Sequence, residues 1–141
     1  MSIMQLDQAR MLHRQRTQLR KIGYSDRAIE LIQYPRNWRP LDNPTLCITT
    51  ESNCGDTLIL YALIRHGCFE EITFQYIGCV GLLSAVSALT ILLQGKSLVN
   101  AYSITEQDII HYLRHVPDSK YDCVQLAVST LRELLDSCPQ E

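Results

Sequence analysis

The sequence predicts a single α+β domain in which about five or six helices pack on a three-stranded antiparallel sheet. Three short stretches that are rich in β-branched and aromatic residues follow one another with brief links, which favours a meander of strands. Residues 82–93 are apolar nearly all round and carry no charge, as expected for a helix inside a core. A chain of 141 residues is long enough to bury such a core without disulfides.

The N-terminal stretch, residues 4–21, is rich in Gln and Arg and predicts a helix with only a weak apolar stripe. We expect residues 1–23 to form a helical extension and residues 24–141 to form the domain proper. Because arginine dominates this stretch, a mitochondrial presequence is the alternative, but serine is scarce. A helix that docks on the domain or faces a partner is the preferred interpretation.

The first half of the domain predicts one helix and three strands. Ser25 is a suitable N-cap for a helix over 26–33, which Pro35 ends, and a proline-rich loop follows to Pro44. Strands are predicted over 45–50 and 57–64. A third strand is predicted over 72–77, where Ile72, Phe74 and Tyr76 alternate with polar residues.

The second half of the domain predicts helices. The spacing of apolar residues changes from that of a strand to that of a helix at Gly78-Cys79. The apolar helix that follows ends near Gly95. Helices over 97–102 and 105–114 come next, the second with Thr105 and Asp108 in the spacing of a capping box. Pro117-Asp118-Ser119 breaks the chain again, and a last helix follows to about Asp136.

Charge and hydropathy exclude several classes of protein. The net charge of −2 gives no global field for nucleic acid, and we expect no nucleic-acid partner. Residues 76–93 approach the roughly 20 apolar residues of a membrane span, but Ser, Thr and Gln dilute them, and we expect no membrane segment. The first ten residues lack the pattern of a signal peptide, so we expect a cytoplasmic protein whose six cysteines stay reduced.

Three cysteines occur where metal sites are commonly built. Cys54 lies in a loop between strands, whereas Cys79 and Cys123 begin helices, where the helix dipole favours the thiolate. Asp56 follows Cys54 across a flexible glycine and completes a candidate set of four donors, Cys54, Asp56, Cys79 and Cys123. Spacing alone does not select this set, because other combinations with Cys47, Cys68 and Cys138 are equally available, and buried cysteines often serve only as small apolar side chains.

A resemblance to a known family favours this set over the others. The order of short motifs resembles the U-type iron–sulfur cluster assembly scaffolds, the IscU/NifU family, over about residues 24–135. The matching motifs, in chain order, are Tyr24-Ser25-Asp26, Tyr34-Pro35-Arg36-Asn37, Cys54-Gly55-Asp56, Phe74 with Gly78-Cys79, Gly95-Lys96-Ser97-Leu98, Asp108-Ile109 and Lys120 with Cys123.

The resemblance implies both a fold and a ligand set. The fold is an α+β domain with a three-stranded antiparallel sheet, and Cys54, Asp56, Cys79 and Cys123 would hold Zn²⁺ or a nascent [2Fe–2S] cluster. Sulfur would come from a cysteine desulfurase, with Cys54 or Cys123 as the persulfide acceptor. An iron donor and cluster-accepting proteins would be further partners. One carboxylate among thiolates suits a cluster that must be released, since it is a harder and poorer ligand.

The chain also departs from the family pattern. Asp122 stands where scaffolds have His, so it is either an extra ligand or a charge that raises the pKa of Cys123. The family's chaperone motif keeps only Pro117 and Lys120, which argues against recognition by a dedicated Hsp70-type chaperone.

The leading hypothesis is therefore a divergent cluster-assembly scaffold and not an enzyme. One alternative is a zinc-dependent sulfur acceptor, a sulfurtransferase without a stable cluster. Another alternative is a regulatory module that binds the desulfurase through its basic N-terminal helix.

Overall fold

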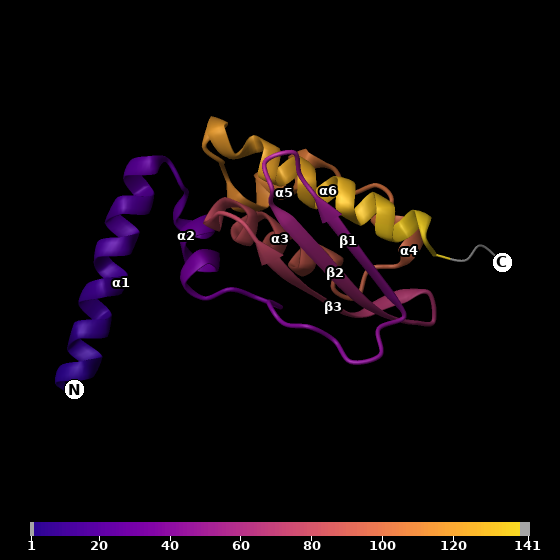
Figure 1. Ribbon diagram of the computed structural model, residues 1–141, viewed down its shortest axis with the longest axis horizontal. Helices are drawn as coiled ribbons and strands as arrows, with labels where there is room; N and C mark the ends of the chain where they lie inside the picture. Colours follow the sequence, from indigo (N-terminus) through magenta and orange to yellow (C-terminus); the bar gives the residue numbers. More distant parts are fainter. Residues whose placement is uncertain (1, 139–141) are drawn as a thin grey trace.

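The computed structural model describes residues 2–138 and shows a small sheet covered by helices (Figure 1). Residue 1 and the last three residues of the predicted domain lie outside the described residues. The elements in chain order are α1 (Ile3–Ile22), α2 (Asp26–Gln33), β1 (Leu46–Glu51), β2 (Thr57–Arg65), β3 (Cys68–Ile77), α3 (Val80–Leu93), α4 (Leu98–Ala101), α5 (Glu106–Leu113), the 3₁₀ turn η1 (Asp118–Lys120) and α6 (Tyr121–Asp136).

The three strands form the predicted antiparallel meander, with the order β1-β2-β3. The third strand is longer than the sequence suggested, because it begins at Cys68 instead of Ile72. The reason is an irregularity of the register at Leu63/Ile64, which is followed in the chain by a tight turn at His66-Gly67, where both residues have positive φ. The bulge lets pairing continue up to the turn although the alternation of side chains is interrupted there.

One face of the sheet is buried under α3 and α6. Leu58, Leu60 and Ala62 of β2 alternate toward this face and are fully buried, whereas the residues between them are only partly covered. Helix α6 packs on β1 and β2, and α3 packs on β3. The strand period of two therefore separates a fully buried face from a partly covered one.

Helix α3 is the centre of the molecule, and it packs against α2, α5, α6 and β3. Every residue from Gly81 to Thr90 is buried, as the uncharged sequence predicted. Its Ser84 and Thr90 hydroxyls donate to carbonyls of the preceding turn, so burial leaves them hydrogen-bonded. Among the described helices, none is both long and apolar enough to cross a membrane.

Helix α1 leaves the body of the molecule at one end, and most of its side chains are exposed (Figure 1). Its one buried residue is Leu19, near the C-terminus of the helix. Gln33 of α2 donates to the Leu12 carbonyl, and Arg16 donates to Gln33, so the second half of α1 lies along α2. The first half extends beyond α2. The proposed boundary near residue 23 coincides with Gly23, the left-handed cap that ends α1.

Candidate metal centre

Three segments that are distant in sequence meet at one end of the sheet. The pairs Glu51↔Thr57 and Thr57↔Ile77 are the last of the two ladders at this end. Antiparallel pairing therefore places the β1–β2 loop beside the chain that leaves β3. That chain enters α3 through Gly78 and Cys79, and the first turn of α6 brings Cys123 to the same place.

Cys79 and Cys123 form the core of this site. Cys79 is the N-cap residue of α3, and Cys123 lies in the first turn of α6 with 4% of its surface exposed. Their sulfur atoms are 3.6 Å apart, and both cysteines are free thiols. Two thiolates on one tetrahedral zinc ion, with bonds of about 2.3 Å, would be about 3.8 Å apart. The observed spacing thus already suits two ligands of one metal.

The two thiols differ in their electrostatic environment. Burial, the neighbouring Cys79 sulfur and the Asp122 carboxylate together raise the pKa of Cys123 to about 12. Burial also acts against the charged form of Cys79, but the N–H groups at Leu82 and Gly81, the Cys123 thiol and Lys120 outweigh it and lower the pKa of Cys79. The Cys79 sulfur makes no direct capping bond, so the first turn of α3 acts on it mainly through its dipoles. Cys79 is therefore the sulfur that ionises first.

Asp56 approaches the same site from the β1–β2 loop. A Cβ atom added at Gly78 would lie 2.9 Å from the Asp56 Oδ1, which shows that the carboxylate packs against the residue preceding Cys79. The loop is closed by hydrogen bonds between Ser52 and Asp56, in both directions, and by Gly55 with a φ of 88°. The closed turn therefore holds the Asp56 carboxylate beside Gly78, the residue before Cys79.

Cys54 lies at the exposed tip of this loop, two residues from Asp56. Across residues 2–138, no group of three or more His, Cys, Asp or Glu side chains converges closely enough to hold a metal ion. The structure thus unites Cys79 with Cys123 and brings Asp56 to Gly78, but within the described residues neither Asp56 nor Cys54 joins the two thiols closely enough to complete a metal site. Asp122, the additional candidate, is exposed and acts on Cys123 through its charge.

Two residues beside the thiols entered the sequence interpretation only as parts of family motifs, with no role at the metal site. Lys120 has methylene groups 3.2 and 3.3 Å from the position of a Cβ at Gly81, and its charge favours the thiolate form of both cysteines. The Tyr24 hydroxyl lies 2.9 Å from the same position. No periodicity marks either residue, because Tyr24 precedes a helix cap and Lys120 ends a 3₁₀ turn.

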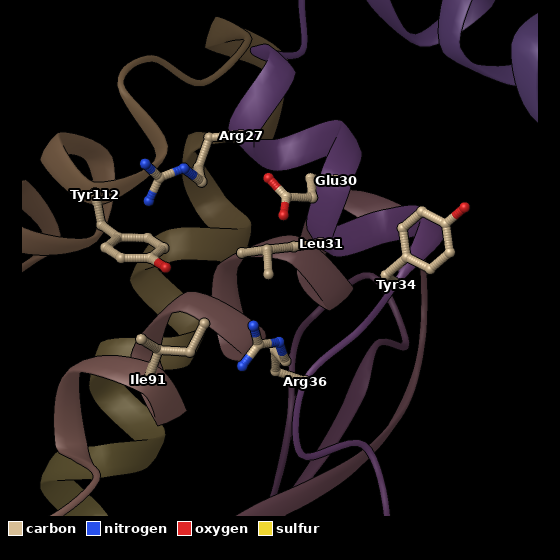
Figure 2. Close-up of a pocket in the computed structure, with 7 residues that line it drawn as sticks. All are labelled: Arg27, Glu30, Leu31, Tyr34, Arg36, Ile91 and Tyr112. Atoms are coloured by element: carbon tan, nitrogen blue, oxygen red, sulfur yellow. The ribbon is translucent and has the colours of Figure 1, made fainter.

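A separate pocket lies between α2, α3 and α5 (Figure 2). Its volume is about 300 Å³, and it is lined by Arg27, Glu30, Leu31, Tyr34, Arg36, Ile91 and Tyr112. The Arg27 guanidinium lies 4.8 Å from the centre of the Tyr112 ring, in the geometry of a cation–π contact. No cysteine lines this pocket, so it is distinct from the sulfur centre.

The donors present fit a thiophilic metal ion or an iron–sulfur cluster. Two thiols at a ligand-like separation, one of them with a lowered pKa, and a nearby carboxylate are the chemistry that zinc and iron prefer. The apolar residues of α3 behind Cys79 exclude water from one side.

Comparisons with known proteins agree with this fold. The family model described as "NifU-like N terminal domain" matches residues 23–138. The chain is 30% identical over 114 residues to the iron–sulfur cluster assembly scaffold protein IscU 1 of Archaeoglobus fulgidus, which covers 79% of this chain and 74% of the relative. It is 28% identical over 116 residues to the IscU scaffold protein of Escherichia coli K12, covering 79% and 90% of the two chains.

Solved structures show the same architecture. The N-terminal part of a NifU-like protein from Brucella abortus superposes with a TM-score of 0.68 at 15% identity, covering 84% of this chain and 95% of that one. At that identity the likeness establishes the fold. Together with the sequence matches, it shows that this chain belongs to the IscU/NifU family, whose shared unit is the NifU-like N-terminal domain.

Proposed function

We propose that the protein is an iron–sulfur cluster assembly scaffold that holds Zn²⁺ or a transient [2Fe–2S] cluster at Cys54, Asp56, Cys79 and Cys123. The observation that carries the proposal is the 3.6 Å separation of the Cys79 and Cys123 sulfurs, with the Asp56 carboxylate packed against Gly78, the residue before Cys79. The names of its relatives, which describe iron–sulfur cluster assembly scaffold proteins, support the same role. The structural unit for this role is residues 24–141, with residues 1–23 as an extension.

Sulfur would arrive from a cysteine desulfurase as a persulfide. The thiolate of Cys54 attacks the outer sulfur of the donor persulfide; the sulfur–sulfur bond breaks, and the donor leaves as a thiolate while Cys54 becomes the persulfide. We assign this step to Cys54 and not to Cys123, because Cys54 is exposed at a loop tip whereas Cys123 is buried. An iron donor and a cluster-accepting protein complete the expected set of partners.

The test is metal and acid-labile sulfide analysis, with ultraviolet–visible spectra, on anaerobically purified protein before and after reconstitution. Cys79→Ala should abolish stoichiometric metal, whereas Cys47→Ala, which removes an exposed thiol on β1, should retain it. Wild-type protein without bound metal or cluster would overturn the proposal.

A zinc-dependent sulfur acceptor without a stable cluster is the second candidate, and the exposure of Cys54 favours it equally. Mass spectrometry after incubation with a cysteine desulfurase and cysteine distinguishes the two. A persulfide on Cys54 in zinc-loaded protein that never assembles a cluster would select the acceptor role.

A further inference from the structure

The hydroxyl of Tyr24 is buried in the metal-free protein without a hydrogen-bond partner. Only 4% of the Tyr24 surface is exposed, and no group within residues 2–138 accepts from or donates to its oxygen. Buried tyrosine hydroxyls usually find a partner, because leaving one unpaired carries a desolvation cost. A tyrosine in this position therefore needs an explanation that a phenylalanine would not.

The hydroxyl is directed at the sulfur centre. It lies 2.9 Å from the position that a Cβ of Gly81 would occupy, so it reaches the first turn of α3, two residues after Cys79. The charges of Cys79 and Cys123 both act on it, which places it within electrostatic range of the two thiols. Neither sulfur accepts its proton in the free protein.

The backbone around Tyr24 holds this direction firmly. The Tyr24 N–H donates to the Leu19 carbonyl at the end of α1, and Ser25 begins α2 as its N-cap. The backbone of Tyr24 is thus held between two helices. Its side chain is buried and the described residues offer its hydroxyl no acceptor, so an acceptor would arrive with a bound group.

We propose that the Tyr24 hydroxyl donates a hydrogen bond to an inorganic sulfide of the [2Fe–2S] cluster held at Cys79 and Cys123. This inference rests on the proposed function, because the acceptor arrives with the cargo. Tyr24 is then a positioning residue for the cluster, since hydrogen bonds to sulfur tune the stability and potential of such clusters. A zinc ion brings no sulfide, so zinc binding should not use this contact.

The first measurement is the thermal unfolding of metal-free Tyr24→Phe. Removing an unpartnered buried hydroxyl while keeping the ring should leave the unfolding midpoint unchanged or raise it. The matched control is Tyr61→Phe, because the Tyr61 hydroxyl donates to Gln75 on β3, within the sheet. That variant should lower the midpoint. A lowered midpoint for Tyr24→Phe would show that the hydroxyl already has a partner and would overturn the proposal.

The second measurement is made on reconstituted protein by resonance Raman spectroscopy in H₂O and D₂O. The bridging iron–sulfide modes of wild type should shift on deuteration, and Tyr24→Phe should lose the part of that shift that comes from the hydroxyl. The cluster of Tyr24→Phe should also decay roughly five-fold faster than that of wild type, which is the effect of losing one ordinary hydrogen bond. Zinc affinity should equal that of wild type.

The outcomes separate this inference from the proposed function. A cluster in Tyr24→Phe with the deuterium shift and lifetime of wild type overturns the inference alone. Weakened zinc binding in the same variant also overturns it, because the hydroxyl would then act on a thiolate ligand. A wild-type protein that holds neither zinc nor cluster overturns the proposed function and, with it, this inference.

Discussion

Gly78 and Gly81 control, as single residues, how closely other groups approach the sulfur centre. Asp56 packs against Gly78, and Tyr24 and Lys120 pack against Gly81, at distances that leave no room for a Cβ atom. Neither glycine has a positive φ, so space and not backbone conformation requires them. Substitution by alanine therefore tests each contact without straining the backbone.

Gly78→Ala should weaken metal binding without unfolding the protein. The new Cβ would lie 2.9 Å from Asp56 Oδ1, and the short aspartate side chain can turn away at little cost. We expect the zinc affinity to fall by about 10-fold, the size of a disturbed ligand shell. Competition with a chromophoric chelator measures it.

The double variant Gly78→Ala/Asp56→Ala is the control for this prediction. If Gly78→Ala acts only by displacing the carboxylate, it should cause no further loss once Asp56 is alanine. Independent, additive losses in the two variants would contradict this account.

Gly81→Ala should destabilise the metal-free protein by about 1–2 kcal/mol, since overpacking outweighs the better helix propensity of alanine. The added Cβ would meet the Tyr24 oxygen at 2.9 Å, and Tyr24 is too firmly held to move. In a Tyr24→Phe background that oxygen is gone, and the loss should become clearly smaller. Urea unfolding of the four proteins measures the coupling, and an unchanged loss would place the clash on Lys120 instead.

Helix α2 shows how one capping residue can join two helices. The Ala28 N–H donates to the Ser25 hydroxyl oxygen, and the same hydroxyl donates to the Leu113 carbonyl at the end of α5. Ser25 is buried, so both bonds are shielded from water. This link fixes the start of α2, next to Tyr24, relative to the helices around α3.

Ser25→Ala should therefore cost more than loss of an ordinary cap. We expect about 2 kcal/mol in the free energy of unfolding, because the helix loses its cap and the Leu113 carbonyl loses its donor. The control is Ser97→Ala, which removes the cap of α4 at a less buried position. It should cost no more than about 1 kcal/mol. Equal losses in urea unfolding would mean that the bond to Leu113 contributes nothing.

Across the whole molecule, stability should fall at alkaline pH in the metal-free state. Burial raises the pKa of Cys123 from 9.0, and of Tyr24 from 10.0, to about 12 in each case. Between each ordinary pKa and the raised pKa, the unfolded chain has released a proton that the folded chain still binds. Rising pH therefore lowers the free energy of unfolding in this range. The lowered pKa of Cys79 acts in the opposite direction. Ionisation of Cys79 stabilises the folded state, and this stabilisation is lost as the pH falls through the pKa of Cys79 in the folded protein.

Urea unfolding between pH 8 and 12 checks this pH dependence. The loss should begin near pH 9, and Cys123→Ala should show a shallower fall than wild type. Parallel curves for the two proteins would exclude Cys123 as a source of the effect.

Zinc should stabilise the whole fold, because the ligands proposed for it lie in the β1–β2 loop, α3 and α6. A ligand at 100 times its dissociation constant stabilises the folded state by about 2.7 kcal/mol, which in a chain of this size raises the unfolding midpoint by roughly 5–10 °C. Cys79→Ala should show no such rise in a thermal shift assay. A full rise in that variant would place the zinc elsewhere.

Local sequence patterns determined most of the secondary structure. Alternation of apolar and polar residues identified β3, the uncharged run identified α3, and Ser25 and Thr105 marked the starts of α2 and α5. These signals are local because caps and periodicity depend on residues within one or two turns. The same signals placed Cys79 at the N-terminus of α3.

Only the tertiary structure decided which groups meet. Cys79 and Cys123 are 44 residues apart, and their contact depends on how α3 and α6 pack on the sheet. The early start of β3 depends on a bulge in its pairing, and the direction of the Tyr24 hydroxyl depends on space at Gly81. The sequence alone determined the elements and the chemical kinds of donor, because those are local properties. Their distances, exposure and pKa shifts arise from packing between remote segments, which only the folded molecule brings together.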